Sequence, residues 1–489
     1  MKLSQNNLKL LPAEVEKPLY ERRGLKPAIV HIGVGGFHRA HQAFYLDELL
    51  NKGLTDWAIC GMGVRQADES IYKALKEQDY LYTLLVKHPD GAIRSRIIGA
   101  MVDYVFAPEN PAVAVARLAD EQTKIVSLTI TEGGYNFDQN GDFIFDNPDI
   151  QRDIHHPEAP KTVFGLFACA LKTRYLQGIK PFTVLSCDNI QRNGDVMRKM
   201  LLSFTERFDK SLADRIRTDV SFPNSMVDRI TPVTMLQDIE LLQETTGIED
   251  ACPVTCEPFI QWVLEDRFSA GRPVWEQVGV QFVKDIDPYE KMKLRLLNAG
   301  HSFLGFTGSL LGYQTIDEAV NNPLICKCLR AFMDKEVTPL LGLIKGVDLD
   351  DYKDTLMERF RNPNIRDQLT RICSESSVKL PKFLIPTVKE QLERKGPIHY
   401  AVIALAAWRR TLELYAAGKY DYPIQDVMLG ELTQAAVHDN PVTFLHLEAI
   451  FCDLAQNPRF VDEFINTSKH IRELGIEKTF IQLITNKTI

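Results

Sequence analysis

Short apolar runs alternate with segments of helical periodicity in the first half of the chain. The runs are rich in β-branched residues, and the segments between them place apolar residues three and four positions apart. The expected strands are 28–32, 57–64, 124–131 and 182–186, and the expected helices are 40–51, 111–120 and 163–175. Residues 81–86 and 93–102 flank the turn sequence Pro89-Asp90-Gly91, which indicates an antiparallel hairpin. Mostly apolar strands that alternate with helices predict a parallel sheet covered on both faces.

The pattern changes near residue 285. Helical periodicity dominates from there on, over 289–313, 324–341, 401–417 and 443–454, and no strong strand candidate follows. The length of 489 residues also exceeds the roughly 250–300 residues that one hydrophobic core usually serves. We therefore expect an α/β domain over residues 1–285 and an all-α domain over residues 286–489.

The composition is that of a folded protein in water, with 45% apolar and 25% charged residues. The net charge of −8 gives no support for a nucleic-acid or membrane partner. Nine cysteines without a C-x-x-C motif favour reduced thiols, and no second pair completes a metal site with Cys252 and Cys256. Residues 1–10 lack the apolar core of a signal peptide, and residues 400–408 are too short an apolar run for a membrane helix. We expect a cytoplasmic protein without a metal ion.

A glycine-rich turn, Gly33-Val34-Gly35-Gly36-Phe37, follows the first expected strand. Glycines between a strand and a helix let the backbone approach a pyrophosphate, and the helix N-terminus favours its negative charge. The motif departs from G-x-G-x-x-G because residue 38 is His38. Its place at the head of the alternating strands and helices predicts a dinucleotide-binding, Rossmann-type domain that uses these five residues.

The acid that would hold the adenosine ribose should follow the second strand. Asp68 lies just past the end of that strand, and the alternative is that it is a solvated loop carboxylate. Arg65, three residues earlier, is suited to meet a 2′-phosphate instead. The choice between NAD and NADP therefore stays open.

Residues 289–301 (YEKMKLRLLNAGH) carry four polar side chains on one side of an expected helix. At about 100° per residue, and with Glu290 at zero, Lys293 falls near −60°, His301 near +20° and Asn298 near +80°. Apolar residues point in nearly every other direction, which is typical of a buried helix. One interpretation is a structural ion pair between Glu290 and Lys293. The other is a buried lysine whose pKa is lowered by desolvation, so that it acts as a base near neutral pH.

Several motifs together resemble the polyol-specific long-chain dehydrogenases. They are residues 33–41 (GVGGFHRAH), 129–135 (TITEGGY), 186–189 (SCDN) and 224–232 (NSMVDRITP), together with the K-x4-N-x2-H element of Lys293, Asn298 and His301. The matches extend from about residue 25 to residue 390, and the combination is far more specific than any one motif.

The resemblance implies an NAD(P)-dependent, metal-independent interconversion of D-mannitol and D-fructose by hydride transfer at C2. It implies that Lys293 is the general base, that Asn189 and Asn298 hold the developing alkoxide, and that Glu290 gates proton exchange with the lysine. Further implied contacts, with the polyol or with the cofactor, are made by His301, Asp228, Arg371, Lys379 and Glu132.

Alternatives to this function stay open. Ala67 stands where the family often has a glutamate that repels a 2′-phosphate, so NADP use is possible. A D-arabinitol dehydrogenase, and a hexuronate oxidoreductase that uses Arg371 and Lys379 for a carboxylate, belong to the same superfamily. A dinucleotide sensor without turnover would not need Lys293 with the two asparagines. No coiled-coil seam is visible, and we expect a monomer or a weak oligomer.

Overall fold

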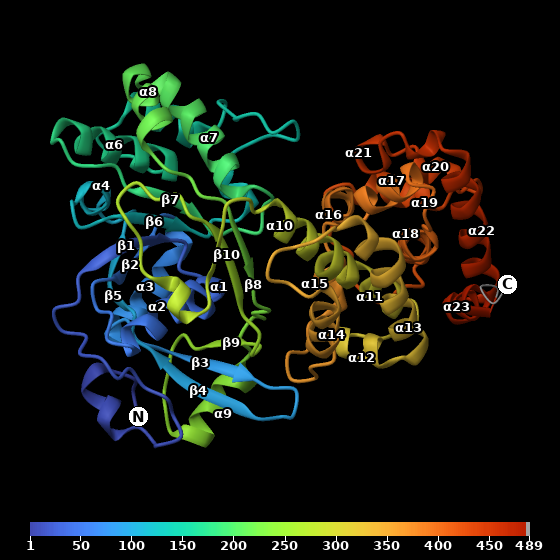
Figure 1. Ribbon diagram of the computed structural model, residues 1–489, viewed down its shortest axis with the longest axis horizontal. Coiled ribbons are helices and arrows are strands. Elements are labelled where there is room, and N and C mark those ends of the chain that lie inside the picture. Colours follow the sequence, from blue (N-terminus) through green and yellow to red (C-terminus); the bar gives the residue numbers. More distant parts are fainter. Residues whose placement is uncertain (486–489) are drawn as a thin grey trace. The chain divides into compact units, whose positions relative to one another are not determined.

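The computed structural model describes residues 1–485 and divides the chain into two units (Figure 1). The first unit is Met1–Asp287, and the second begins at Pro288. The first unit contains all the strands, whereas every element of the second unit, within the described residues, is helical. This confirms the expected combination of an α/β domain and an all-α domain.

A five-stranded parallel sheet forms the centre of the first unit. Its strand order is β5-β2-β1-β6-β7, and all four neighbouring pairs are parallel. The strands are β1 (Pro27–Ile32), β2 (Ala58–Gly63), β5 (Met101–Phe106), β6 (Ile125–Leu128) and β7 (Thr183–Ser186). The order reverses direction between β1 and β6, which is the switch point of a doubly wound sheet.

The expected strand 93–102 is wrong, because the chain changes sheets within it. Residues Ile93–Ile98 form β4, which pairs antiparallel with β3 (Tyr82–Lys87), whereas β5 begins at Met101 in the central sheet. The change occurs at Gly99, whose backbone N–H donates to Asp47 Oδ1 at 2.9 Å. A Cβ at Gly99 would lie 2.8 Å from Pro18 Cγ, so the chain passes through a space that only glycine fits. An unbroken apolar run hides this transition.

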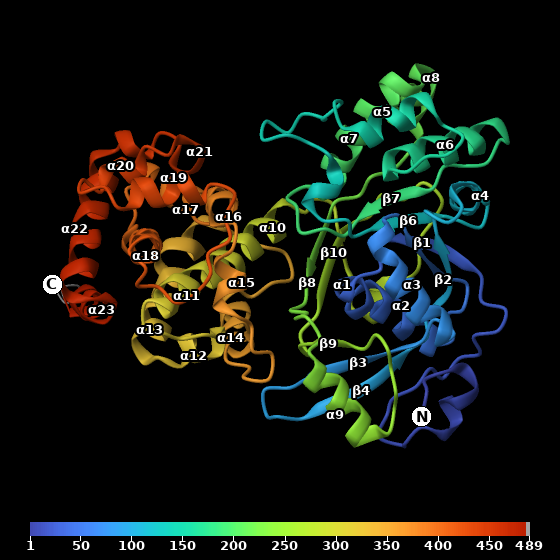
Figure 2. The ribbon, with the colours of Figure 1, turned by 180° about the vertical axis from the view of Figure 1, so that it is seen from behind.

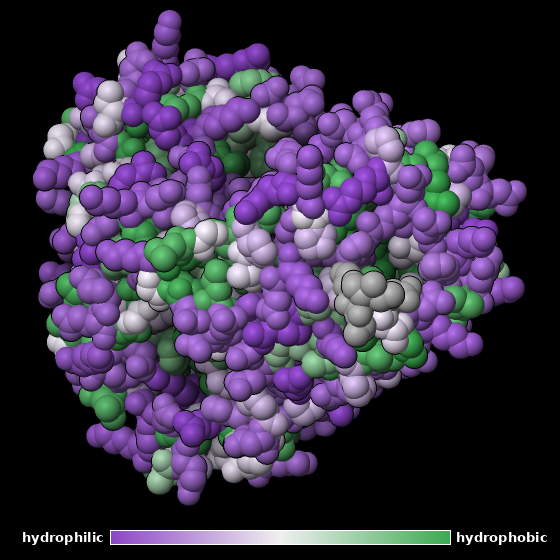
Figure 3. All heavy atoms as spheres, turned by 45° about the vertical axis from the view of Figure 1, so that its right-hand side comes forward, coloured by the Kyte–Doolittle hydropathy of each residue, from purple (hydrophilic) through white to green (hydrophobic). Residues whose placement is uncertain are grey.

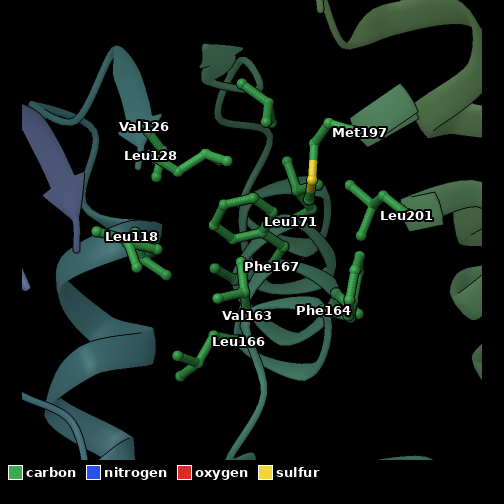
Figure 4. Packing of buried hydrophobic residues seen from close by; sticks show 14 of the residues in the cluster. Leu118, Val126, Leu128, Val163, Phe164, Leu166, Phe167, Leu171, Met197 and Leu201 are labelled. Atoms are coloured by element: carbon green, nitrogen blue, oxygen red, sulfur yellow. The ribbon is translucent and has the colours of Figure 1, made fainter. Parts of the chain in front are cut away.

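Alternate residues of the central strands enter different cores. Val30, Cys60 and Val126 face one core, where Figure 4 shows Leu128 and Leu118 beside Phe167 of α6 (Val163–Leu176). Their sequence neighbours, such as Ile29, face the other core. The helices of the first core are α4 (Pro111–Ala119), α5 (Pro148–His155), α6, α7 (Asn193–Phe208) and α8 (Lys210–Asp219). Both ribbon views place α6 and α7 next to β7 (Figure 2). The sheet is therefore covered on both faces, as the apolar strands predict.

Two smaller sheets complete the first unit, and the β3–β4 hairpin is the only part of them that the sequence predicts. One has the order β11-β10-β8 and the other β4-β3-β9. The strands added here are β8 (Ser225–Asp228), β9 (Val254–Cys256), β10 (Gln261–Glu265) and β11 (Gln281–Val283). Runs of three to five residues carry too little periodicity to separate a strand from a loop.

The second unit is built around α11 (Ala299–Ser309) and α18 (His399–Ala416), which pack on one another through Phe306 and Trp408. The expected helix 289–313 is not continuous: α10 (Asp287–Lys293) and α11 are joined by a π-helix over Leu294–Asn298. The expected helix 443–454 is also interrupted, since α20 (Val442–Leu445) and α21 (Glu448–Phe451) are separate turns.

Among residues 1–485, no helix combines the length and the apolar character needed to cross a membrane. The face drawn in Figure 3 is mainly hydrophilic, and its apolar residues lie in small groups. Scattered exposed apolar side chains such as Leu19 and Leu343 are ordinary on a protein surface and need no partner.

Two stacked histidines lie beneath the glycine-rich turn. The rings of His31, in β1, and His38 are 3.3 Å apart between centroids and almost parallel. His31 Nδ1 lies 2.8 Å from Ser127 Oγ, and its Nε2 lies 3.0 Å from Thr129 Oγ1. Burial lowers the pKa of His31 to about 3, and burial together with the neighbouring His31 holds the pKa of His38 well below its usual range. The pair is therefore neutral near pH 7.

We expect this pair to make the first unit sensitive to acid. Below about pH 6.5 a histidine in the unfolded chain binds a proton, whereas folded His31 stays neutral because its pKa is lowered. The unfolding free energy therefore falls as the pH falls. The loss is up to about 1.4 kcal/mol per pH unit for each histidine and continues down to the folded pKa. His31→Gln should reduce the slope of unfolding free energy against pH between 6.5 and 5, measured by urea denaturation.

The matched control is His155→Gln, which removes an exposed histidine from the same unit and should change the slope little. Equal slopes for the parent and His31→Gln would show that the buried pair does not carry the acid sensitivity.

Candidate active site

The glycine-rich turn contains one position at which the fold itself requires glycine. Gly33 has a φ of +88°, and a Cβ there would lie 2.2 Å from the carbonyl oxygen of Thr129. A Cβ at Gly35 or Gly36 would meet only ordinary contacts, at 3.7 Å or more. Protein packing therefore accounts for Gly33, whereas the other two glycines leave room for a ligand to approach the backbone.

A short helix that the sequence does not predict separates this turn from the expected helix 40–51. α1 covers only Gly36–Ala40, and the backbone breaks at His41 before α2 (Gln42–Asn51) begins. Phe37 stacks on His41 with ring centroids 4.9 Å apart, and Val34 is buried against the sheet. Of the five motif residues, Gly33 lines the adjoining pocket, whereas Val34 and Phe37 contribute to packing.

A pocket of about 900 Å³ opens at the carboxyl ends of β1, β2, β5 and β6. The loops after these strands line it through Gly33, Val64, Ala107 and Thr129. Its remaining wall comes from α5 (Pro148–His155) and from the residues that lead into α6. In open α/β sheets, ligands bind at this edge beside the switch point, and the volume suits a dinucleotide.

Asp68 lines this pocket, and its carboxylate accepts hydrogen bonds from backbone N–H groups. Its Oδ2 accepts the N–H groups of Val64 and Arg65, both at 3.0 Å, and its side chain is 13% exposed. Arg65 Nη2 donates to Asp68 Oδ1 at 3.3 Å, although most of the arginine side chain is in solvent. The two candidate determinants of cofactor choice are thus direct neighbours, and Asp68 is not a free loop carboxylate.

The loop after β6 is held by a buried carboxylate that sequence reasoning missed. Asp188 accepts the N–H groups of Ile130 and Thr131 at 3.0 and 2.8 Å, and the hydroxyl of Tyr135 at 2.8 Å. Burial nevertheless raises the pKa of Asp188. Glu132 lies in this loop with an exposed side chain, and its neighbours on both sides, Thr131 and Gly133, line the pocket.

Asn189 directly follows Asp188 at the carboxyl end of β7, and its side chain is exposed. Asp228, the last residue of β8, is buried. The amide of Asn193 connects these two places, because its Nδ2 donates to the carbonyls of Asp188 and Ser225, both at 2.9 Å. The first unit therefore holds both residues on fixed strand ends.

In the second unit, the π-helix changes the angular relation of the polar side chains. The Ala299 N–H donates to the carbonyl of Leu294, five residues earlier, instead of four. Residues five apart are separated by about 140° in an α-helix, and the wider π turn reduces this separation. The expected uniform α-helical spacing is therefore wrong, and Asn298 lies closer to the side of Lys293 than it predicts. Because this helix has apolar residues on all sides, it has no single apolar face whose shift would reveal the π turn in the sequence.

This segment contains three cations within a stretch of five residues, Lys291, Lys293 and Arg295. A single carboxylate on α17 (Ile385–Glu393) pairs with two of them. Glu390 accepts from Lys291 Nζ at 2.9 Å and also from Arg295. Lys293 lies between them in sequence and is 7% exposed, and Glu290 is buried as well. The Oδ1 of Asn298 is buried and has no hydrogen-bond partner among residues 1–485.

Arg371 and Lys379 are brought together at the turn between α15 (Leu369–Cys373) and α16 (Ser376–Phe383). Arg371 donates to both carboxylate oxygens of the buried Asp367, at 2.8 and 2.5 Å. Lys379 Nζ donates to the carbonyl of Ile372 at 3.3 Å, and burial lowers its pKa. A Cβ at Gly305 would lie 2.7 Å from Cys373 Sγ, so this glycine lets α15 pack closely on α11.

His301 lies on α11 with its ring 4.8 Å from that of Phe360. The second unit thus presents a buried lysine and an asparagine oxygen on one segment, a nearby imidazole, and a cationic turn packed on the same helix. A buried base and neutral amide donors are suited to take a proton and to stabilise an alkoxide. Among residues 1–485, no three His, Cys, Asp or Glu side chains are grouped as metal ligands.

Comparison with known proteins covers both units. The model of the mannitol dehydrogenase Rossmann domain matches residues 27–277, and that of the mannitol dehydrogenase C-terminal domain matches residues 285–472. The mannitol 2-dehydrogenase of Neosartorya fischeri is 44% identical over an alignment of 499 positions, which covers 99% of this chain and 99% of that protein. The mannitol 2-dehydrogenase of Aspergillus terreus is 43% identical, with 98% of each chain covered.

Two solved structures have the same fold over nearly the whole chain. The Pseudomonas fluorescens mannitol 2-dehydrogenase, in a ternary complex with NAD and D-mannitol, is 44% identical with a TM-score of 0.89, covering 99% of this chain and all of that one. A D-sorbitol dehydrogenase in substrate-free form is 38% identical with a TM-score of 0.91, covering 98% and 100%. These matches confirm the resemblance drawn from the motifs, and the chain belongs to the mannitol dehydrogenase family.

Proposed function

We propose that this protein is an NAD-dependent mannitol 2-dehydrogenase that interconverts D-mannitol and D-fructose at C2. The observation that carries the proposal is the full-length identity of 44% with an enzyme whose structure contains NAD and D-mannitol. Two features of this chain support it independently. They are the pocket at the switch point of the sheet and the buried lysine of the second unit.

The pocket fits a dinucleotide in both shape and chemistry. Gly33 lines it, and the free space beside Gly35 and Gly36, two and three residues later, would let a diphosphate approach the backbone. Asp68 would accept from the adenosine ribose, since it lines the pocket and a carboxylate favours a free 2′-hydroxyl. Bound NAD would supply the acceptor for the hydride that leaves C2.

The remaining chemistry would fall to residues of this chain. Lys293 would take the proton from the C2 hydroxyl, and the buried Glu290 on the same helix would pass it on toward solvent. Asn298 and Asn189 would donate to the developing alkoxide, and each such donor is worth a factor of about 10²–10³ in kcat.

The polyol would be held by His301, Asp228, Arg371 and Lys379. A neutral hexitol offers hydroxyl groups that both donate and accept, so carboxylate and cationic partners bind it through directional hydrogen bonds. The pairing of Arg371 with Asp367 fixes the direction of the guanidinium, which suits recognition of one stereoisomer.

A second candidate substrate is D-sorbitol, because the solved D-sorbitol dehydrogenase matches this chain with a TM-score of 0.91. Sorbitol and mannitol differ only in the configuration at C2, and both give fructose on oxidation there. The hexitol formed from fructose therefore tells the two candidates apart more directly than the rate of either oxidation.

We expect the purified protein to reduce D-fructose with NADH and to form D-mannitol, without an added metal ion. The measurement is the loss of NADH absorbance, followed by chromatographic identification of the hexitol, with D-arabinitol and fructuronate tested in parallel. Sorbitol as the main product would transfer the assignment to the second candidate. No turnover with any of these substrates would refute the proposal.

We expect Lys293→Ala to lower kcat for mannitol oxidation by about 10²–10⁴, because the general base is lost, while NADH binding stays nearly intact. The matched control is Lys291→Ala, two residues away, which removes a partly exposed lysine paired with Glu390. Its kcat should stay within a few-fold of the parent. Similar rates for the two variants would show that Lys293 is not the base.

We expect NAD to be preferred over NADP, and Asp68→Asn to reduce that preference about tenfold. The amide retains one oxygen for the N–H groups of Val64 and Arg65 but removes the charge that repels a 2′-phosphate. The measurement is the ratio of kcat/KM for the two cofactors. Arg65→Ala should increase the preference for NAD, because it weakens the use of NADP alone. An unchanged ratio of kcat/KM in both variants would contradict these roles.

A further inference from the structure

Two cations on the far wall of the cofactor pocket have no role in the function proposed above. Arg152 lies in the last turn of α5, and Lys161 lies directly before α6. Both line the same pocket as Gly33 and Asp68. This wall lies outside every motif on which the family resemblance rests, so the sequence gives no direct signal for it.

A buried carboxylate fixes the wall in place. Asp153 is fully buried, and its oxygens accept the N–H groups of Lys161 and Thr162 at 2.8 and 2.7 Å and the Thr162 hydroxyl at 2.6 Å. A Cβ at Gly165 would lie 2.3 Å from Asp153 Oδ2, so the start of α6 is shaped around this carboxylate. The backbone beside both cations is therefore held rigidly, as a binding wall requires.

The charges of the wall are only partly balanced. Lys161 Nζ lies 3.8 Å from Asp149 Oδ1, and both side chains are more than half exposed, so this pair is weak. Arg152 is half-buried, and its charge opposes the rise that burial gives to the pKa of the neighbouring Asp153, although the two form no close ion pair among residues 1–485. Three charged residues of this wall line the pocket, the cations Arg152 and Lys161 and the carboxylate Asp149, whereas the buried Asp153 does not line it. A cation held at a concave surface attracts an anionic ligand group.

We propose that Arg152, assisted by Lys161, binds a phosphate group of the dinucleotide. The inference rests on the proposed function, in which NAD occupies this pocket. The planar guanidinium offers paired N–H donors that match a phosphate, and the lysine adds a mobile point charge. The phosphate belongs either to the diphosphate, which NAD and NADP share, or to the 2′-position, which only NADP carries.

The test is the affinity of the intact protein for NADH, NADPH and adenosine, measured by fluorescence titration and, for adenosine, by competition. Arg152→Ala should raise the Kd for NADPH, which carries both candidate phosphates, about tenfold and leave the Kd for adenosine, which has no phosphate, unchanged. The affinity for NADPH should also depend less on salt, because one phosphate contact is lost. Lys161→Ala should have the same effects with a smaller amplitude.

The two cofactors identify the phosphate. An equal loss for NADH and NADPH assigns Arg152 to the diphosphate, and a loss for NADPH alone assigns it to the 2′-phosphate. The control is Arg198→Ala, a half-buried arginine of the same unit outside the pocket, which should bind all three ligands like the parent. Arg152→Lys keeps the charge next to Asp153, and should show an intermediate affinity even if Arg152→Ala folds poorly.

Parent-like affinity for NADH and NADPH in both Arg152 variants would overturn the inference and leave the proposed function standing. An equal loss of adenosine affinity would also overturn it, because it would indicate a distorted pocket. If the parent protein bound neither NADH nor NADPH, that result would refute the proposed function, and this inference would be refuted as well because it rests on that function.

Discussion

The carboxyl edge of the central sheet depends on the close approach of Gly33 to the backbone of Thr129. No side chain fits between them, since a Cβ at Gly33 would lie 2.2 Å from the Thr129 carbonyl oxygen. Across this contact the Thr129 hydroxyl donates to the Gly33 carbonyl at 2.7 Å, and Asp188 accepts the next two N–H groups of the loop. β1 and β6 therefore end side by side at the switch point, where the pocket opens.

In the second unit, the main constraint is that α10 and the π-helix after it carry charged side chains although they are buried. Three cations within five residues would be costly in an apolar environment without carboxylate partners. Glu390 forms ion pairs with Lys291 and Arg295, so these two cations have a structural role. Lys293 lies at the junction of α10 and the π-helix, and the wider turn carries Asn298 toward it. π turns are frequent at functional sites, because they redirect side chains without ending the helix.

Periodicity in the sequence is enough to predict the parts of the fold whose faces are packed. β1, β2, β7, α4 and α6 lie within two residues of their expected limits, because each buries a full face of known period. The transition at Gly99 and the π-helix could not be predicted, since the apolar pattern runs through both without a break. Contacts such as Asp188 with Ile130, or Arg295 with Glu390, join residues far apart in the sequence and leave no local signal. The pair Asp367 and Arg371, four residues apart on one turn, is the exception that spacing alone would reveal.

The pairing of charges also bears on the class of substrate. A sugar acid would need a cation whose donors are not already committed to a carboxylate of the protein. Arg371 instead donates to both oxygens of Asp367, and Lys379 Nζ is directed at backbone carbonyls. Drawing Arg371 toward a second carboxylate would compete with a buried partner, whereas a hydroxyl group accepts from a remaining N–H without displacing Asp367. In the function proposed above, where this turn holds the substrate, its geometry therefore favours a neutral polyol over a hexuronate.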